Sequence, residues 1–293
     1  KMLKELKLSN GKLSESQKKQ YWKDGFLSPI NFVSFKETEK FRSELEKIET
    51  DYQKVKLAHT LNTFKRMDAQ CVIPLAYKIA STPLLLNIIE GILGPDIMLY
   101  GAEFFIKEAN TPHIVTMHQD LTYWGLGSTD KMVTAWIALS DVTIESGCMQ
   151  FVSGSHKNQI LPHEDTFSEN NLLSRGQEVQ VEVNENDKTD IILKPGQFSL
   201  HHGRMIHGSG PNRSRDRRVG FVIRYLSPDV KQEVADVDYA ILVRGADRER
   251  NFINYSPPEE LFSDKQITLY EEIRNVKKQA KMSGSNQKSY IYD

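Results

Sequence analysis

A His-x-Asp motif and a distant histidine are the residues of this chain best suited to chemistry. His118 and Asp120 lie two positions apart within the segment 116–120. On a β-strand such residues point to the same face, so an imidazole nitrogen and a carboxylate oxygen can approach one metal ion. His207, separated from Asp120 by 86 residues, is the best candidate for a third ligand. Two histidines and one carboxylate, with other coordination positions open, are typical of non-haem Fe(II) oxygenases.

A cationic anchor is expected beside such a centre. A 2-oxo acid that chelates iron through its keto-acid end leaves a distal carboxylate to be held, and the planar guanidinium of arginine binds a carboxylate bidentately. Arg218 lies eleven residues after His207, beyond a turn at 210–214. Arg224 is six residues further along the same expected strand and therefore on the same face.

Each of these residues also has an ordinary structural interpretation. The metal-ligand candidates could be hydrogen-bonded core residues, and Arg218 could be a surface cation on a strand. The neighbours His201 and His202 are expected to be strand residues, one of them pointing inward. Tyr123 and Trp124, directly after the motif, could be core aromatics or the wall of a pocket.

Helices are expected before residue 95. Ser14 and Gln17 form a capping-box pattern that begins a short helix, with Gly25 near its end. Apolar residues at helical spacing predict a second helix over about 36–55. A third, apolar on more than one face and therefore buried, is expected over about 74–93, where Gly94 and Pro95 stop it.

Short strands follow residue 95. They are expected at 97–100, 103–107, 133–139, 148–152, 197–200 and 218–225, separated by turn residues. This pattern predicts a mainly β fold with flanking α-helices, built on a jelly-roll core. The polar segment 161–187 between core strands is long enough to be a lid over a substrate, with 111–124 as the opposite wall.

One domain is predicted for residues 1–293. A helical N-terminal buttress would span 13–95 and the jelly-roll core 96–230. A C-terminal extension would span 231–282, followed by a disordered tail at 283–293.

Composition excludes several classes of protein. The 293 residues have a formal net charge of −1, without the basic excess of a nucleic-acid binder. No apolar run approaches the ~20 residues of a membrane span, and no secretory signal is evident. The two cysteines, Cys71 and Cys148, fit buried free thiols in a reducing compartment, so we expect a cytoplasmic protein.

These motifs together resemble the phytanoyl-CoA dioxygenase family of Fe(II)/2-oxoglutarate-dependent oxygenases. The resemblance covers about residues 15–230 and is carried by 118–120 with Trp136, and by 207–212 with Arg218. It implies a double-stranded β-helix core with helices supporting one sheet. It further implies that Fe(II), 2-oxoglutarate and O2 are required. Related halogenases have a small residue in place of Asp120, so halogenation is not expected.

The resemblance also implies roles for particular residues. His118, Asp120 and His207 would ligate iron and carry catalysis. Four others would bind the co-substrate: Arg218 and Ser209 would hold the distal carboxylate of 2-oxoglutarate, and Gln119 and Trp136 would line its site. Candidates for contact with the substrate are Lys107, Tyr123, Arg204, Arg224 and Asn171, of which Lys107 is also a candidate for contact with 2-oxoglutarate.

The expected reaction is oxidation of an unactivated C–H bond with release of succinate and CO2. Hydroxylation, radical cyclisation and desaturation all remain open. The expected substrate is a small polar or acidic metabolite such as an amino acid, a phosphonate or a natural-product intermediate, and no nucleic acid or membrane is expected as partner. The alternatives are a non-catalytic metal-containing jelly-roll sensor, a zinc or manganese cupin-type enzyme, and an interaction protein. Arg218 and Ser209 argue against the sensor, which has no need of a carboxylate anchor.

Overall fold

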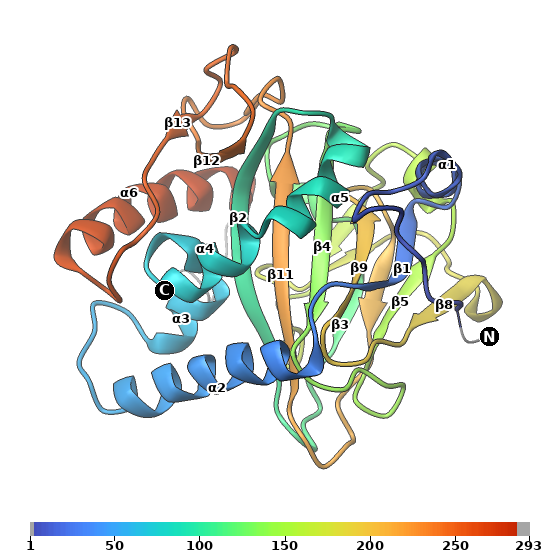
Figure 1. The fold of residues 1–293 in the computed structure, drawn as a ribbon, viewed down its shortest axis with the longest axis horizontal. Coiled ribbons are helices and arrows are strands. Elements are labelled where there is room, and N and C mark those ends of the chain that lie inside the picture. The colour runs from blue at the N-terminus through green and yellow to red at the C-terminus, as the bar shows by residue number, and fades with distance from the viewer. Residues whose placement is uncertain (1–2, 286–293) are drawn as a thin grey trace.

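Two β-sheets stacked face to face form the centre of the molecule, as the computed structural model shows for residues 3–285 (Figure 1). The large sheet has the strand order β1-β9-β4-β11-β2-β12-β13, and the small sheet β3-β10-β5-β8. All pairs are antiparallel except β12 with β13. An apolar cluster that includes Trp136 of the large sheet and Phe151 of the small sheet fills the space between them. This arrangement is the expected jelly roll.

The strands have the following bounds. The large sheet contains β1 (Phe26–Asn31), β9 (Gln197–His202), β4 (Met132–Ala138), β11 (Arg218–Leu226), β2 (Ile97–Lys107), β12 (Tyr239–Arg244) and β13 (Ile253–Asn254). The small sheet contains β3 (Val115–His118), β10 (His207–Ser209), β5 (Met149–Val152) and β8 (Lys188–Ile191), and a separate hairpin contains β6 (His163–Asp165) and β7 (Gln177–Val179).

Helices cover the outer face of the large sheet (Figure 1). They are α1 (Glu15–Asp24), α2 (Phe35–Tyr52), α3 (Leu61–Arg66), α4 (Pro74–Ala80), α5 (Pro83–Leu93) and α6 (Asp264–Lys281). The capping box predicted for α1 is present, because the Ser14 and Gln17 side chains each accept a bond from the other's backbone N–H. None of these helices is both long and apolar enough to cross a membrane.

The helix expected over 74–93 is in fact two helices. Ser81 ends α4, and Thr82 has extended dihedrals (φ −60°, ψ 127°) before α5 begins at Pro83. Proline lacks a backbone N–H and disfavours the helical conformation of the residue before it. Pro83 therefore divides the segment into two helices, although its apolar pattern is continuous.

The two strands expected at 97–100 and 103–107 are one strand, β2. It is continuous because β11 pairs with it from Met98 to Lys107, with one register shift between Arg224 and Tyr225. Three strands of the large sheet were not predicted: β1, an edge strand that tolerates Pro29, and β12 and β13, within the expected C-terminal extension.

The chain end and the expected lid also contain more structure than predicted. Residues 283–285, expected in the disordered tail, form a turn after α6, whereas 286–293 lie outside the described residues. The segment 161–187 is not a plain loop, because β6 and β7 pair within it.

Strand β11 determines what faces the interior. Its odd-numbered residues, among them Phe221, pack on the helices, whereas Arg218, Val222 and Arg224 face the small sheet. Alternation along a strand requires this separation. Gly220 shares the inner face, and a Cβ there would lie 2.0 Å from Cζ2 of Trp136. Because glycine has no side chain, the Trp136 indole can occupy the space above Gly220.

We expect Gly220→Ala to lower the free energy of unfolding by about 1–3 kcal/mol, the usual cost of overpacking a core. Urea denaturation measures the effect. Gly210→Ala is the matched control, since a Cβ there would meet nothing within 4 Å. Equal stability of the two variants would contradict this packing.

Candidate metal and co-substrate site

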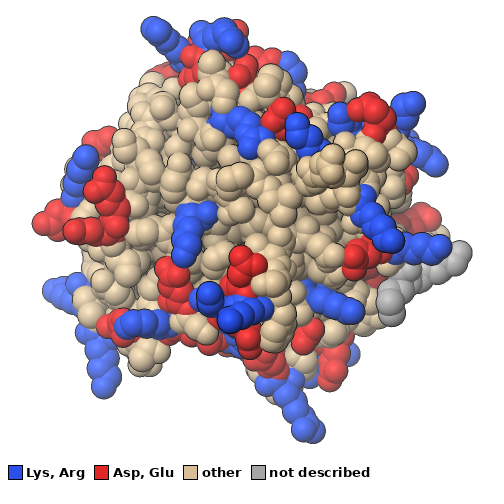
Figure 2. All heavy atoms as spheres, in the orientation of Figure 1, with Lys and Arg blue, Asp and Glu red and all other residues tan. Residues whose placement is uncertain are grey.

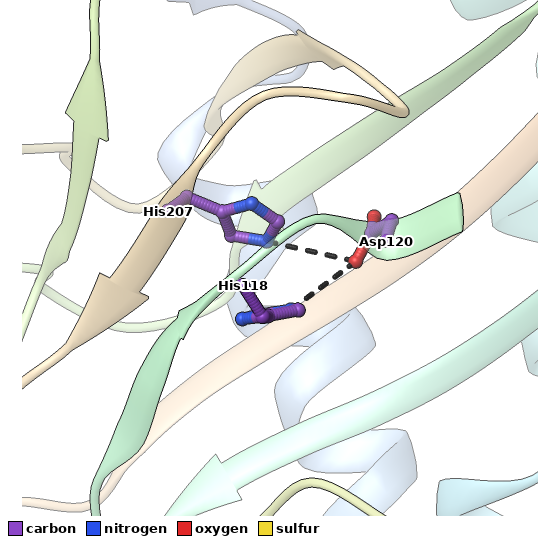
Figure 3. Close-up of side chains that lie close together, drawn as sticks. All are labelled: His118, Asp120 and His207. Atoms are coloured by element: carbon purple, nitrogen blue, oxygen red, sulfur yellow. Dashed lines mark ion pairs between the residues drawn. The ribbon is translucent and has the colours of Figure 1, made fainter. Parts of the chain in front are cut away.

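Three candidate ligands meet at one end of the space between the sheets. His118 ends β3, His207 begins β10, and the two residues pair directly across these strands. Asp120 follows in a short 3₁₀ helix, η2 (Asp120–Tyr123). Its Oδ1 lies 3.4 Å from His118 Nε2 and 3.6 Å from His207 Nε2 (Figure 3). All three residues are buried, and one ligand atom from each lies within 4.8 Å of the others.

Backbone carbonyls fix both imidazoles for metal binding. His118 Nδ1 donates to the carbonyl of Thr116 at 2.8 Å, and His207 Nδ1 donates to that of Met205 at 2.9 Å. A carbonyl can only accept, so each Nδ1 carries the proton and each Nε2 presents a lone pair toward Asp120. Such an outer hydrogen bond orients a histidine that ligates a metal.

The surroundings of Asp120 favour its charged form. Oδ2 accepts a hydrogen bond from Thr134 Oγ1 at 2.9 Å, and Arg224 Nε lies 3.9 Å away. Burial alone would raise the pKa of Asp120, but His207 and Arg224 hold it well below its usual value. Burial lowers the pKa of His207. A carboxylate and neutral imidazoles are the forms that bind a metal, so this donor set fits Fe(II).

A first pocket beside these ligands contains an unpaired buried cation. Arg218 is 1% exposed, and its guanidinium lies 5.2 Å from the Trp136 ring. Its Nη1 donates to the Gly147 carbonyl, and its Nε has no hydrogen-bond partner within residues 3–285. Burial lowers the pKa of Arg218 to about 10. The guanidinium is thus positioned for an anion that the protein itself does not provide.

A second cation lies directly across from Arg218. Lys107 pairs with it between β2 and β11, and its Nζ donates to Ser209 Oγ at 2.6 Å and to the Gly210 carbonyl at 2.5 Å. Within the described part of the chain, no carboxylate lies within 4.0 Å of either cation. Burial, and then the charge of Arg218, lower the pKa of Lys107 to about 6. The buried Arg218 guanidinium and the adjacent Lys107 amine, which a bound carboxylate would help to protonate, fit one carboxylate of a dianion.

A second pocket opens on the other side of the same ligands. His118, Asp120, Phe105, Leu173 and Arg224 line both pockets. The segment 161–187 covers the second pocket through residues 172–174 and Gln177, and η2 covers it through Tyr123. The expected lid and opposite wall therefore do face each other across a cavity. Closure of the segment on a substrate stays a prediction.

Comparison with known proteins identifies the chain. The profile of the phytanoyl-CoA dioxygenase (PhyH) family matches residues 21–220. The chain belongs to this family. Human peroxisomal phytanoyl-CoA dioxygenase is 24% identical over 239 residues, which cover 76% of this chain and 71% of that protein. A probable alpha-ketoglutarate-dependent hypophosphite dioxygenase of Stutzerimonas stutzeri is 24% identical over 226 residues, which cover 73% and 78% respectively.

Solved structures agree with this assignment. The non-heme monooxygenase ThoJ in its apo form superposes with a TM-score of 0.80 at 29% identity, covering 89% of this chain and 96% of that one. CytC3 with Fe(II) and alpha-ketoglutarate shares the fold, with a TM-score of 0.62 at 16% identity, covering 87% and 100% respectively. As a member of the family with an intact His-Asp-His set, the chain is an Fe(II)- and 2-oxoglutarate-dependent oxygenase.

Four predicted site residues line neither pocket: Lys107, which is hydrogen-bonded to Ser209 of the first pocket, and Gln119, Arg204 and Asn171. Gln119 was expected to line the co-substrate site. Its amide instead donates to the Arg204 carbonyl and its oxygen accepts from the Leu161 N–H, because the following position on the strand points to the opposite side from His118.

Two substrate candidates are occupied by structural contacts. The Arg204 guanidinium pairs with Asp130, which lines neither pocket. Asn171 donates to Thr116 Oγ1 and thereby fastens the segment 161–187 to β3. Neither lines a pocket, whereas Tyr123 and Arg224 line the second pocket, and Trp136 and Ser209 the first.

Other residues that line the pockets were not predicted from the sequence. Thr134 is the hydrogen-bond donor to Asp120, a role recognisable only after β4 is placed next to η2. His201 is the inward member of the expected pair, and its Nε2 lies 3.4 Å from Asp120 Oδ2. Arg66 and Lys281 line the second pocket from helices distant in sequence, for which no motif gave a signal.

We expect Asp120→Ala to abolish Fe(II) binding while the protein stays folded, because the remaining imidazoles lack a charged partner. Thr134→Val should weaken Fe(II) binding by about tenfold or more, as losing an outer hydrogen bond to a metal ligand usually does. Anaerobic calorimetry measures both, and Thr134→Ser, which keeps the hydroxyl, should bind as the wild type. Fe(II) affinity unchanged in Asp120→Ala would refute the ligand assignment.

Proposed function

We propose that His118, Asp120 and His207 hold the Fe(II), and that Arg218 with Lys107 holds the distal carboxylate of 2-oxoglutarate. The unpaired, buried guanidinium of Arg218 is the observation that carries this assignment. Ser209 supports it, because its hydroxyl is hydrogen-bonded to Lys107 and lines the same pocket. Trp136 closes the pocket beside the guanidinium.

In this family's chemistry, iron and 2-oxoglutarate activate dioxygen, and 2-oxoglutarate leaves as succinate and CO2. The protein's task is to position the two organic molecules and to exclude water. The first pocket would receive 2-oxoglutarate and the second the molecule whose C–H bond is oxidised. Both pockets reach His118 and Asp120, so both ligands can approach the same ion.

The substrate is proposed to be a small polar or acidic metabolite. The second pocket supports this, because charged side chains from Arg66, Glu103, Arg224 and Lys281 line it. Outside the pockets, the face in Figure 2 mixes basic and acidic side chains without a continuous basic patch, which does not favour a nucleic acid on that face. A cytoplasmic location is supported by Cys71 and Cys148, which are both free and buried.

Turnover of 2-oxoglutarate tests the assignment of Arg218. We expect Arg218→Ala to raise the KM for 2-oxoglutarate by more than about tenfold, since losing one partner of a buried charge pair costs ~2–5 kcal/mol. Succinate formation with Fe(II) and ascorbate measures the KM, and Fe(II) affinity should stay within about twofold.

Arg217→Ala is the matched control. Arg217 is the adjacent arginine, but it points to the opposite side, where it pairs with Glu49 and Glu108. An equal KM in Arg218→Ala and the wild type would place the anchor elsewhere. A wild-type protein that binds Fe(II) and 2-oxoglutarate but never forms succinate would favour the sensor alternative.

The pH dependence of co-substrate binding tests Lys107. Its pKa of about 6 leaves the amine mostly neutral above that pH. A carboxylate placed beside it raises the pKa, so binding takes up a proton, and affinity should fall as pH rises from about 6 toward roughly 9. Calorimetry in buffers of different ionisation enthalpy counts the proton. We expect uptake of up to about one proton near pH 8, and none in Lys107→Met; wild-type binding without uptake would contradict the role.

A further inference from the structure

The second pocket has more positive than negative charge. Its cations are Arg66, Arg224 and Lys281, and its carboxylates are Glu103 and Asp120. Glu103 accepts hydrogen bonds from both guanidiniums, from Arg66 Nε at 3.1 Å and from Arg224 Nη1. Once Asp120 serves the metal, one carboxylate remains for three cations. An anionic ligand would balance the excess.

Lys281 is the cation without a partner. It is the last residue of α6, and its Nζ lies 4.5 Å from the centre of the Trp124 ring. Within residues 3–285, no hydrogen bond or ion pair involves this ammonium group. Burial lowers the pKa of Lys281 to about 8, and the carboxylates of Asp68 and Glu103 offset only part of this effect because neither forms an ion pair with the ammonium group.

Several contacts hold the end of α6 at the pocket. Arg175 Nη1 donates to the carbonyls of Lys281 and Ser283, at 3.3 and 3.1 Å. The same guanidinium pairs with Asp165 and lies 3.8 Å from the Tyr123 ring. The helix end is therefore tied to both walls of the second pocket and positioned as part of its lining.

Lys277 fixes the preceding turn of the helix. Its Nζ donates to Asp68 Oδ1 at 2.7 Å, and both side chains are buried. The two lysines thus have different contacts: Lys277 forms an ion pair with a carboxylate, whereas Lys281 lies over an aromatic ring. The guanidinium of Arg224 lies over the same ring, 4.7 Å from its centre. Two cations on one indole of the pocket wall make a place for a compact anion.

We propose that Lys281, together with Arg224, binds an anionic group of the substrate, a carboxylate or a phosphonate. The inference rests on the proposed function, because the second pocket must be the substrate pocket. Lys281 lies outside the segment 21–220 that matches the family. The C-terminal helix thus supplies a specificity-determining residue to the active site from beyond the matched domain.

Anaerobic calorimetry on the protein loaded with Fe(II) and 2-oxoglutarate tests the proposal without turnover. The probes are butyrate and propylphosphonate, each compared with a neutral counterpart, butyramide and dimethyl propylphosphonate. We expect the wild type to prefer at least one anion over its counterpart, and Lys281→Met to weaken binding of that anion by roughly tenfold or more. The preferred probe identifies the anionic group as carboxylate or phosphonate.

Matched variants separate the ligand contact from a general effect of charge. Lys281→Arg should retain the preference, and Lys265→Met removes the same charge from an exposed position on α6 and should change nothing. Lys281→Gln repeats the test if the methionine variant fails to fold. The inference is overturned if Lys281→Met or Lys281→Gln binds the anion as the wild type does, or if the wild type prefers neither anion.

The 2-oxoglutarate titration keeps this proposal distinct from the preceding one. Each variant of Lys281 should bind 2-oxoglutarate as the wild type does, because Lys281 does not line the first pocket. A wild type that fails to bind Fe(II) and 2-oxoglutarate would refute the proposed function. Normal binding of both, without the anion preference, would refute only the role of Lys281.

Discussion

Charge buried between two apolar layers is the constraint on which this structure depends. Alternation along β2 and β11 places Lys107, Arg218 and Arg224 on the inner face of the large sheet, where Lys107 and Arg218 are almost fully buried and the Arg224 side chain is 13% exposed. A buried charge is costly unless it is paired. The protein pairs Arg224 with Glu103 but leaves Lys107 and Arg218 without a carboxylate within residues 3–285. The unpaired cations mark the place where a ligand would supply the missing charge.

The pairing of β3 with β10 brings two of the three candidate metal ligands together beside these charged side chains. Direct opposition of His118 and His207 brings their rings to 4.2 Å between centroids, and the backbone carbonyls behind them fix both tautomers. Asp120 leaves the strand at the start of η2, and Thr134 and Arg224 of the large sheet stabilise its carboxylate. The small sheet therefore supplies the two candidate imidazole ligands and η2 the carboxylate, whereas the large sheet supplies the hydrogen bond and the positive charge that stabilise this carboxylate.

The two pockets share this centre but differ in construction. Residues of the jelly-roll strands build the first pocket, which suits a co-substrate common to the family. Helices α3 and α6 and the segment 161–187 contribute to the second, so it depends on elements outside the strands. Lys281 is an example, because it belongs to a helix outside the segment that matches the family and yet lines the second pocket. Variation in substrate can then arise without any change to the metal centre.

The sequence alone determined the fold class and the metal-ligand candidates, and it predicted that Arg218 is the anchor for 2-oxoglutarate. Their signals are local or periodic: a spacing of two residues for His118 and Asp120, and a spacing of six residues along one strand for Arg218 and Arg224. Only the tertiary structure decided which polar side chains face the pockets. Gln119 stands between the two motif residues and points away, and Arg204 is paired with Asp130, although each has the composition of a site residue. Arg66 and Lys281 reach the second pocket from helices far apart in the chain, because packing of α3 and α6 against the sheet brings them together, and no spacing along the sequence encodes that contact.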